Sequence, residues 1–246
     1  MIYIGCAGWS IPWAHAHLFP AEGTHLARYA QVFPAVEINS SFYRHHRPAT
    51  YARWAASTPE GFRFAVKVHR TITHYKRLRQ PELLDEFLPG VLELGEKLGT
   101  LLLQLPPGLA FDPDQAIAFF TALRERYQGY VVCEPRNASW FGEDADALLH
   151  EFHIARAVVD PSPVGEELIP GGWPGLTYVR LHGSPIIYRS PYEHDFLESL
   201  AGKLREWEAN GPVWCIFNNT VEGAAIPNAL ELMDLLGEQP DSVANH

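Results

Sequence analysis

The chain has 246 residues, of which 47% are hydrophobic and 20% are charged, and its formal net charge is −10 at pH 7. This apolar content is ample for a folded core and excludes a disordered chain, and no apolar run approaches the ~18 residues of a membrane span. The negative charge speaks against a protein that coats nucleic acid with its whole surface.

Three cysteines, Cys6, Cys133 and Cys215, lie far apart in apolar runs. This usage is typical of reduced, buried thiols. The chain also starts directly in a strand-like segment, without the charged start of a signal peptide. We therefore expect a cytoplasmic protein with no membrane partner.

Short, almost continuously apolar runs predict strands that are buried on both faces. These strands are Ile2–Cys6, Ala35–Asn39, Phe62–Val68, Thr100–Leu105, Tyr130–Glu134, Ile154–Asp160, Leu176–His182 and Val213–Phe217. Helix patterns lie between most of them. The predicted helices are Thr24–Phe33, Ala49–Ser57, Pro81–Leu98, one capped by Asp112, Asp144–Phe152, His194–Asn210 and Ala224–Leu236.

Eight strands that alternate with helices predict an α/β fold, a TIM-type (β/α)8 barrel. The rival is a doubly wound open sheet, but no strand is followed by a phosphate-binding glycine motif. Residues 161–175 contain four prolines and four glycines, so we expect a loop in place of the helix after strand 6. The prediction is one domain over residues 1–236, followed by a polar, flexible tail over 237–246.

Polar residues end seven of the eight predicted strands, and barrels of this type place their active sites at those ends. The polar residues at these ends are Glu37, Asn39, Lys67, Gln104, Glu134, Arg136, Asp160, Arg180, His182, Asn218 and Asn219. We expect a ligand pocket there.

Three acids face three bases in this set, which suits acid/base catalysis on an anionic compound, phosphorylated or sugar-like. Glu134 is the first candidate for the acid/base. Further catalytic candidates are Glu37, Asp160 and Lys67. The expected anion clamps are Lys67, Arg136 and Arg180, and the expected orienting amides are Asn218 and Asn219. The alternative is a non-catalytic scaffold whose charges only pair with each other.

A divalent metal, Mg²⁺ or Mn²⁺, is a lesser alternative on Glu134, Asp160 and His182. Sugar isomerases of this barrel type usually add a carboxylate from the last strand, where this chain has Asn218. We therefore predict no cofactor. His74 follows the third strand and is a candidate ligand-binding residue.

The segment 44–79 contains nine cationic residues and one acidic residue, a net charge of +8, so the rest of the chain carries −18. Aromatic side chains follow several strands, among them the candidate ligand-binding residues Trp9, Tyr43 and Trp140. Aromatic rings near cations can stack a base or a sugar. Nucleic acid is therefore the alternative partner to a small anion, whereas the simplest interpretation is a solvated basic face with aromatic packing.

The ordered motifs resemble the YecE-like family, or domain of unknown function 72, along nearly the whole chain. The resemblance rests on Gly8-Trp9, Val36-Glu37-Ile38-Asn39-Ser40-Ser41-Phe42-Tyr43-Arg44, Phe62–Lys67, Ile72-Thr73-His74, Gln104-Leu105-Pro106-Pro107, Glu134 with Arg136, Tyr178–Gly183 and Phe217–Thr220. It implies a TIM-type barrel and supplies no established reaction. The chain departs from the family pattern at Cys6-Ala7 and at Pro135 and Asn137, beside Arg136.

Overall fold

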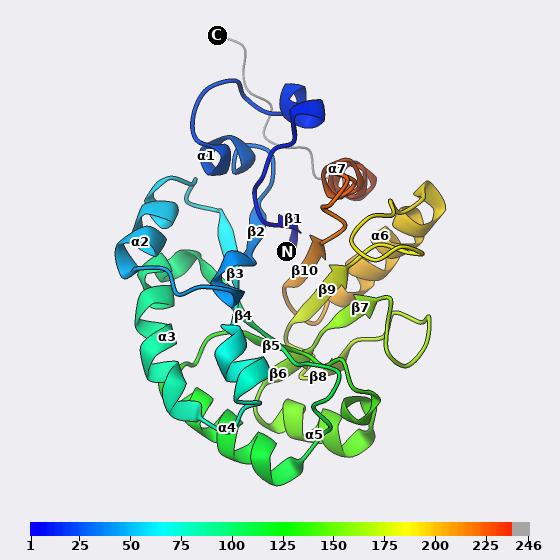
Figure 1. Ribbon diagram of the computed structural model, residues 1–246. Helices are drawn as coiled ribbons and strands as arrows, with labels where there is room; N and C mark the ends of the chain where they lie inside the picture. The colour runs from blue at the N-terminus through cyan, green and yellow to red at the C-terminus, as the bar shows by residue number, and fades with distance from the viewer. Residues whose placement is uncertain (238–246) are drawn as a thin grey trace.

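The computed structural model describes residues 1–237. Its sheet wraps into a nearly closed barrel surrounded by helices (Figure 1). The strand order is β7-β9-β10-β1-β2-β3-β4-β5-β6-β8. The predicted tail falls almost entirely on residues 238–246, which lie outside the described residues.

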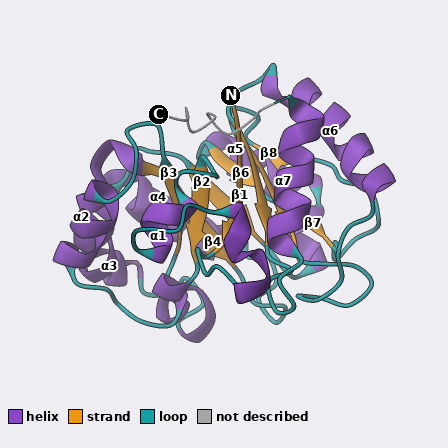
Figure 2. Ribbon diagram, turned by 90° about the horizontal axis from the view of Figure 1, so that it is seen from above, coloured by secondary structure: helices purple, strands orange, loops and turns teal. Residues whose placement is uncertain are grey.

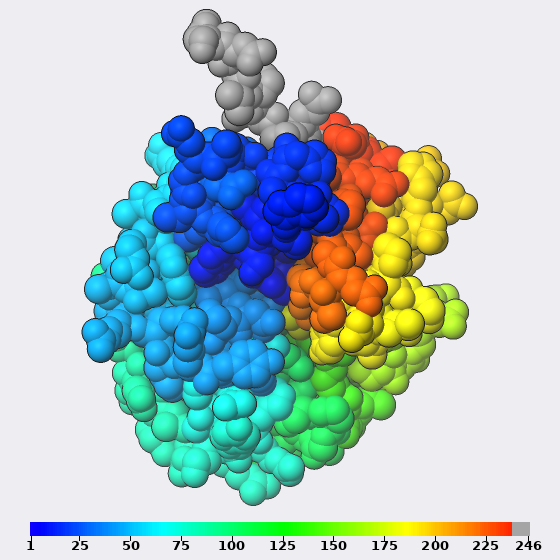
Figure 3. Space-filling model, turned by 45° about the horizontal axis from the view of Figure 1, so that its top comes forward, coloured from blue at the N-terminus to red at the C-terminus, as the bar shows by residue number. Residues whose placement is uncertain are grey.

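Every pairing in the barrel wall is parallel. The strands of the wall are β1 (Ile2–Ala7), β2 (Ala35–Ile38), β3 (Arg63–Lys67), β4 (Leu98–Gln104), β5 (Val131–Glu134), β6 (Ile154–Arg156), β7 (Val158–Asp160), β9 (Thr177–Leu181) and β10 (Val213–Phe217). The first and last of them pair with each other. The first and last strands of the wall therefore lie side by side, and Figure 3 shows the N-terminal segment next to the last of the described residues.

The sixth barrel strand is interrupted at Ala157 and serves two neighbours. Its first part, β6, pairs with β5, and its second part, β7, pairs with β9. The Ala157 amide still donates to the Cys133 carbonyl oxygen at 2.8 Å. The single strand Ile154–Asp160 predicted from the sequence is thus two short strands, and together they link the two halves of the barrel wall.

Helices cover the outside of the barrel (Figure 2). They are α1 (His25–Tyr29), α2 (Pro48–Ala56), α3 (Leu84–Val91), α4 (Pro113–Arg126), α5 (Glu143–Glu151), α6 (His194–Glu208) and α7 (Ala225–Leu236). The predicted cap of α4 is confirmed, because Asp112 Oδ1 accepts from the Gln115 amide at 3.2 Å. The segment between β7 and β9 has no helix and instead contributes the short β8 (Gly171–Gly172), antiparallel to β6.

Two predicted helices are shorter than expected. The segment 81–98 contains the α-helix α3 between two 3₁₀ stretches, and Gly95 has φ of 58°, a left-handed conformation that ends the helical path. The segment 24–33 keeps only the five residues of α1. Apolar periodicity marked both helical faces, but it could not show where packing against the sheet stops each helix.

The interior of the barrel is a small core distinct from the larger core under the helices. Its members are Ala35, Ala65, Leu102, Val132, Ala155, Ala157, Val159, Leu176, Tyr178, Trp214 and Ile216. Trp214 and Tyr178 are the large rings, with 5.9 Å between their centroids, and four alanines are the small members. None of the helices in residues 1–237 has both the length and the hydrophobicity to cross a membrane.

Candidate functional site at the barrel mouth

The candidate site is the next inward-facing layer above this small core. Side chains alternate along a strand, so a residue two positions after an inward-facing one also faces inward. The pairs that obey this rule are Ala35 with Glu37, Ala65 with Lys67, Val132 with Glu134, Tyr178 with Arg180, and Ile216 with Asn218. The first member of each pair packs in the core, and the second adds a polar group at the carboxyl end of its strand.

Arg180 joins two carboxylates across the barrel, and all three side chains are fully buried. Its Nε and Nη2 atoms donate to the two oxygens of Glu37 at 2.9 and 2.7 Å, and its Nη1 donates to Glu134. Tyr178 donates its hydroxyl to Glu37 Oε2 at 3.0 Å. Buried charges require such pairing, so this part of the site is a closed ion network.

Glu134 extends the network to Arg136, whose Nη2 also contacts its carboxylate. Burial opposes ionisation of this carboxyl, but the positive charges of Arg180 and Arg136 hold the pKa of Glu134 well below its usual range. Arg136 is the more open of the two arginines, with 18% of its side chain exposed, and its Nε has no hydrogen-bond partner in residues 1–237. This donor atom is buried, and Glu134 Oε1 likewise has no hydrogen-bond partner in residues 1–237.

His182 is wedged between Arg136 and Asn218. Arg136 Nη2 lies 2.6 Å from Nε2, and Asn218 Nδ2 lies 3.0 Å from Nδ1. Burial lowers the pKa of His182 to about 4, and the charges of Arg180 and Arg136 act in the same direction. Because arginine only donates, Nε2 of this neutral ring accepts from Arg136. His182 therefore orients Arg136 and carries no charge near neutral pH.

Lys67 is the charged group of the layer that has no counterion. No carboxylate within residues 1–237 forms an ion pair with it, and its Nζ has no hydrogen-bond partner there, although only 6% of the residue is exposed. The ammonium lies 4.3 Å from the centroid of the Phe42 ring. Burial lowers the pKa of Lys67 to about 8; Arg180 and Arg136 contribute to the lowering, and Glu37 and Glu134 oppose it.

His74 is the second ring beside Lys67. It packs edge-on against Phe42, with 4.9 Å between the ring centroids, and its Nδ1 lies 2.9 Å from the Thr73 hydroxyl. Burial and the charge of Lys67 both lower its pKa. The structure therefore brings His74 to the same wall of the mouth as Lys67, where it is a neutral polar group.

Several other predicted site residues serve the packing of the rim. Asp160 accepts the Tyr192 hydroxyl at 2.6 Å, and Asn219 donates to Ser190 O and Asn228 Oδ1, both at 3.0 Å. Trp140 is buried and donates its ring N–H to Leu109 O at 3.0 Å. The ligand-binding role expected for Trp140 therefore does not fit its buried place in the structure. An aromatic residue that follows a strand can equally pack between the loop and the helices.

The remaining candidates line the mouth more openly. Asn39 follows β2 and has a buried Oδ1 with no partner in residues 1–237. Trp9 packs edge-on against Trp54, with 5.0 Å between the ring centroids. Tyr43 is exposed and stacks with Arg70. Asn39 and Trp9 are half-buried, Tyr43 is exposed, and none of the three takes part in the ion network.

The three residues of the alternative metal site do not form a ligand cluster. Within residues 1–237, no group of three His, Cys, Asp or Glu side chains is placed to hold a metal ion. Glu134 and His182 adjoin each other, with 3.6 Å between Oε1 and Nε2, but Asp160 is taken up by Tyr192. The arginines that surround Glu134 occupy the positions where a cation would have to bind.

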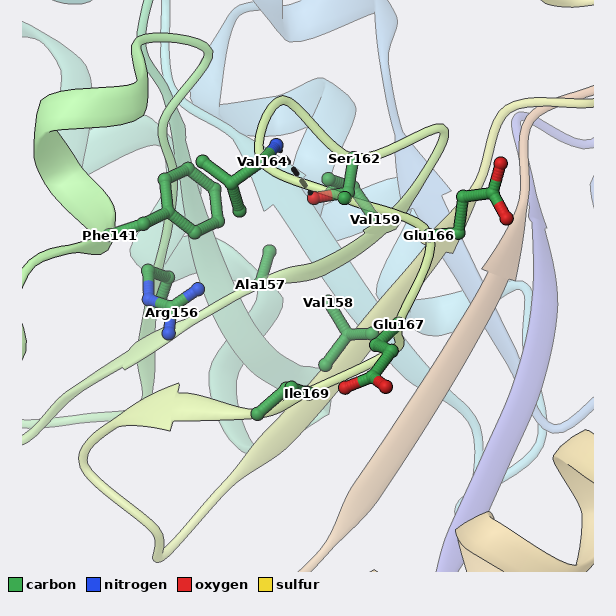
Figure 4. Close-up of a pocket in the computed structure, with 11 residues that line it drawn as sticks. Phe141, Arg156, Ala157, Val158, Val159, Ser162, Val164, Glu166, Glu167 and Ile169 are labelled. Atoms are coloured by element: carbon green, nitrogen blue, oxygen red, sulfur yellow. Dashed lines mark hydrogen bonds between the residues drawn. The ribbon is translucent and has the colours of Figure 1, made fainter.

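Several hollows lie outside this layer. One, of about 820 Å³, is lined in part by the predicted site residue Asp160 together with Pro185 and Tyr192. Another, of about 460 Å³, is formed by the loop after β7 with Phe141 and Arg156, and it holds none of the predicted site residues (Figure 4). A smaller one, of about 170 Å³, lies between the end of β1 and the start of α7. None of these three includes Lys67 or Glu134, whose layer is the mouth of the barrel itself.

A family model described as "Protein of unknown function DUF72" matches residues 3–246. The chain belongs to this DUF72 family. It is 28% identical to UPF0759 protein YunF of Bacillus subtilis, over 96% of this chain and 95% of that protein. It is 34% identical to UPF0759 protein YecE of Escherichia coli K12, over 67% of this chain and 61% of that protein.

Two solved structures of DUF72 family proteins share the fold. One, from Enterococcus faecalis V583, has a TM-score of 0.82 at 23% identity, with 96% of each chain covered. The other, from Thermotoga maritima MSB8, has a TM-score of 0.77 at 25% identity, with 97% of this chain and 100% of that chain covered. The family resemblance and the barrel expected from the sequence are therefore confirmed.

Sequence reasoning missed two members of the site in this DUF72 protein. The Tyr178 hydroxyl donates a hydrogen bond to Glu37, and the Lys67 ammonium packs over the Phe42 ring. The signal for Tyr178 was present, because it lies two positions before Arg180 on the same strand and so shares its inward face. Phe42 lies in a 3₁₀ turn after β2, where no periodicity indicates a direction.

Proposed function

We propose that the barrel mouth binds a small anionic compound through Lys67. The observation that carries the proposal is the charge balance of the buried layer. Three cations, Lys67, Arg136 and Arg180, face two carboxylates, Glu37 and Glu134, and His182 is neutral near pH 7. The layer therefore has one positive charge in excess, and a buried excess charge favours a bound counterion.

The free donor atoms support the same proposal. Arg136 Nε lacks a hydrogen-bond partner in residues 1–237, no carboxylate there forms an ion pair with Lys67, and the charge of Arg136 acts on Lys67. A carboxylate or phosphate group accepts hydrogen bonds from both types of donor. Lys67 and Arg136 are thus the contacts that we assign to the anion, whereas Arg180 is fully used by Glu37 and Glu134.

An acid/base role for Glu134 stays a prediction, and its contacts favour another role. Two arginines contact its carboxylate, and its pKa is held far below neutrality. A general acid or base works best with a pKa near the working pH. We therefore assign Glu134 to the positioning of Arg136, and of the two groups Lys67 is the one whose pKa lies close to neutrality.

Replacing Lys67 tests the proposal. We expect lactate or inorganic phosphate to raise the unfolding temperature of the wild-type protein. Lys67→Met should abolish this shift, because the excess charge disappears. Lys97→Met is the matched control, since Lys97 donates to the carbonyl oxygens of Ala55 and Thr58 and lies away from the mouth. An anion response that survives in Lys67→Met would overturn the proposal.

The same variant should be more stable than the wild type at neutral pH. The pKa of Lys67 falls from an ordinary 10.5 to about 8 in the folded protein, so the unfolded chain holds more protons between these values and wild-type stability rises with pH across this window. The advantage of Lys67→Met, about 3 kcal/mol below pH 8, should shrink as the pH approaches 10.5. Urea unfolding at several pH values measures it.

A second candidate function, binding of single-stranded nucleic acid, is favoured by one cluster on the rim. The Arg70 guanidinium lies 5.5 Å from the Tyr43 ring centroid and 5.4 Å from that of Tyr75, and both rings are exposed. They lie in or beside the segment 44–79 with its charge of +8. Exposed rings beside cations suit base stacking and phosphate contacts.

This candidate predicts salt-dependent binding of single-stranded DNA or RNA, measured by fluorescence anisotropy. The double substitution of Arg77 and Arg79 by Ala should weaken the binding by about tenfold, because both side chains are exposed in the basic segment. Arg205→Ala, on the far helix α6, is the control. Binding that is absent, or that does not change with salt, would contradict this candidate.

A further inference from the structure

Lys67 has the surroundings of an amine nucleophile as well as those of an anion receptor. Its Nζ has no hydrogen-bond partner in residues 1–237 to hold its lone pair or its protons, and the Phe42 ring covers one side of it at 4.3 Å. The positive charges of Arg180 and Arg136 disfavour its protonated form. With a pKa of about 8, a substantial fraction of the Lys67 amine is neutral near pH 7. Amines activated by desolvation and by neighbouring cations are the ones that attack carbonyl carbons.

We propose that Lys67 forms a Schiff base with a small aldehyde or ketone that also carries an anionic group. This inference rests on the proposed anion site and specifies its substrate class. Lys67 would take the carbonyl carbon, while the free Nε of Arg136 would receive the anionic group. A 2-oxo acid, in which carbonyl and carboxylate are adjacent, is the smallest compound with both features.

The charge of the layer fits each stage of this reaction. The neutral amine attacks the carbonyl carbon and a C–N bond forms. The C–O bond then breaks, and the oxygen leaves as water with two hydrogens that belonged to the ammonium. The product is an iminium ion with one positive charge, as the ammonium had. The buried excess charge that balances the anion is therefore kept, and no oxidant or reductant is consumed.

The two wall residues suit the exchange of water and protons. Phe42 shields one side of the amine from solvent, and desolvation favours the iminium because water would hydrolyse it. His74 packs on the same ring, and its pKa is lowered in part by Lys67 itself, so the two groups lie close together. A neutral imidazole at this place can accept the proton that the ammonium must lose before it attacks.

The test is reductive trapping with pyruvate. The full-length protein is incubated with pyruvate and sodium borohydride, which reduces an imine to a stable secondary amine, and the adduct is located by intact-mass measurement and peptide mapping. The chain has four lysines, Lys67, Lys76, Lys97 and Lys203. Near pH 7.5 we expect one adduct per chain, at least ~tenfold enriched at Lys67, since ordinary lysines have pKa values near 10.4.

Controls separate covalent chemistry from anion binding. Lactate carries the carboxylate without a carbonyl and should protect Lys67, whereas acetone carries the carbonyl without a charge and should label it poorly. Lys67→Arg has no primary amine, so we expect it to lose the adduct. Lys97→Arg should be labelled at Lys67 like the wild type. Peptide mapping of the wild type gives the site even if Lys67→Arg fails to fold.

Each outcome is decisive. Trapping at Lys67 that lactate suppresses supports the inference. Lactate binding without any pyruvate adduct overturns the Schiff base and leaves the anion site standing, and so does equal labelling of Lys76 or Lys203. If neither lactate nor phosphate binds the wild-type protein, the proposed function fails and this inference fails with it.

Discussion

Arg180→Leu should lose most of the stability of the fold. The substitution leaves Glu37 and Glu134 buried without the guanidinium that joins them, and removal of one partner of a buried ion pair costs about 3–5 kcal/mol. Here one arginine serves two carboxylates, so we expect a loss of at least about 5 kcal/mol, comparable to the whole stability of many domains. Urea unfolding followed by circular dichroism measures it.

Three comparisons make this result specific. Arg189→Leu removes an exposed ion pair with Glu222, which should cost less than about 1 kcal/mol. Combining Arg180→Leu with Glu37→Gln and Glu134→Gln should recover part of the loss, because no unpaired charge then remains buried. The damage in Arg180→Leu should also shrink as the pH falls, since its carboxyls can then be protonated. A loss of less than about 2 kcal/mol would contradict a closed ion network.

Gly5→Ala should be the second severe substitution, through backbone contact. A Cβ at residue 5 would lie 2.1 Å from the carbonyl oxygen of Ala35, its partner in β2. That oxygen accepts the Tyr29 hydroxyl at 3.0 Å, and Tyr29 in turn receives the Cys6 amide at 2.8 Å. The strands cannot separate without breaking this bridge, so we expect a loss of about 3 kcal/mol or more.

A helical glycine provides the matched control. Gly202 lies on the exposed side of α6, and a Cβ there would meet no atom within 4 Å. Gly202→Ala should therefore stabilise the protein by about 0.5–1 kcal/mol through helix propensity. The two substitutions add the same methyl group. If the unfolding temperature falls in Gly5→Ala and rises in Gly202→Ala, the loss in Gly5→Ala comes from steric contact and not from the added methyl group itself. A mild effect of Gly5→Ala would mean that β1 and β2 can move apart.

The barrel and its polar mouth could be predicted because both follow from local patterns. Runs such as Val131–Glu134 are apolar until the last residue, and the polar residue at the end faces the mouth. What the patterns could not supply is which groups pair. The Arg180–Glu37 contact joins residues 143 positions apart, and it depends on the register and closure of the barrel.

The roles assigned to individual residues were harder to predict for the same reason. Asp160 and Glu134 both end apolar strands, but a loop tyrosine, Tyr192, satisfies Asp160, whereas arginines surround Glu134. Trp140 has the sequence context of a rim aromatic and is buried instead. Lys67 was expected among the catalytic candidates, but its lack of a counterion becomes visible only when every carboxylate at the mouth has been assigned a partner.

The Arg180 network also has a consequence for how the chain folds. Its carboxylates come from β2 and β5, but the guanidinium that joins them arrives with β9, late in the chain. Until that strand docks, Glu37 and Glu134 need water around them, so the mouth stays hydrated in any partly folded species. Long-range closure of this kind is slow. We therefore expect the mouth to form in the last folding step, together with drying of the barrel interior.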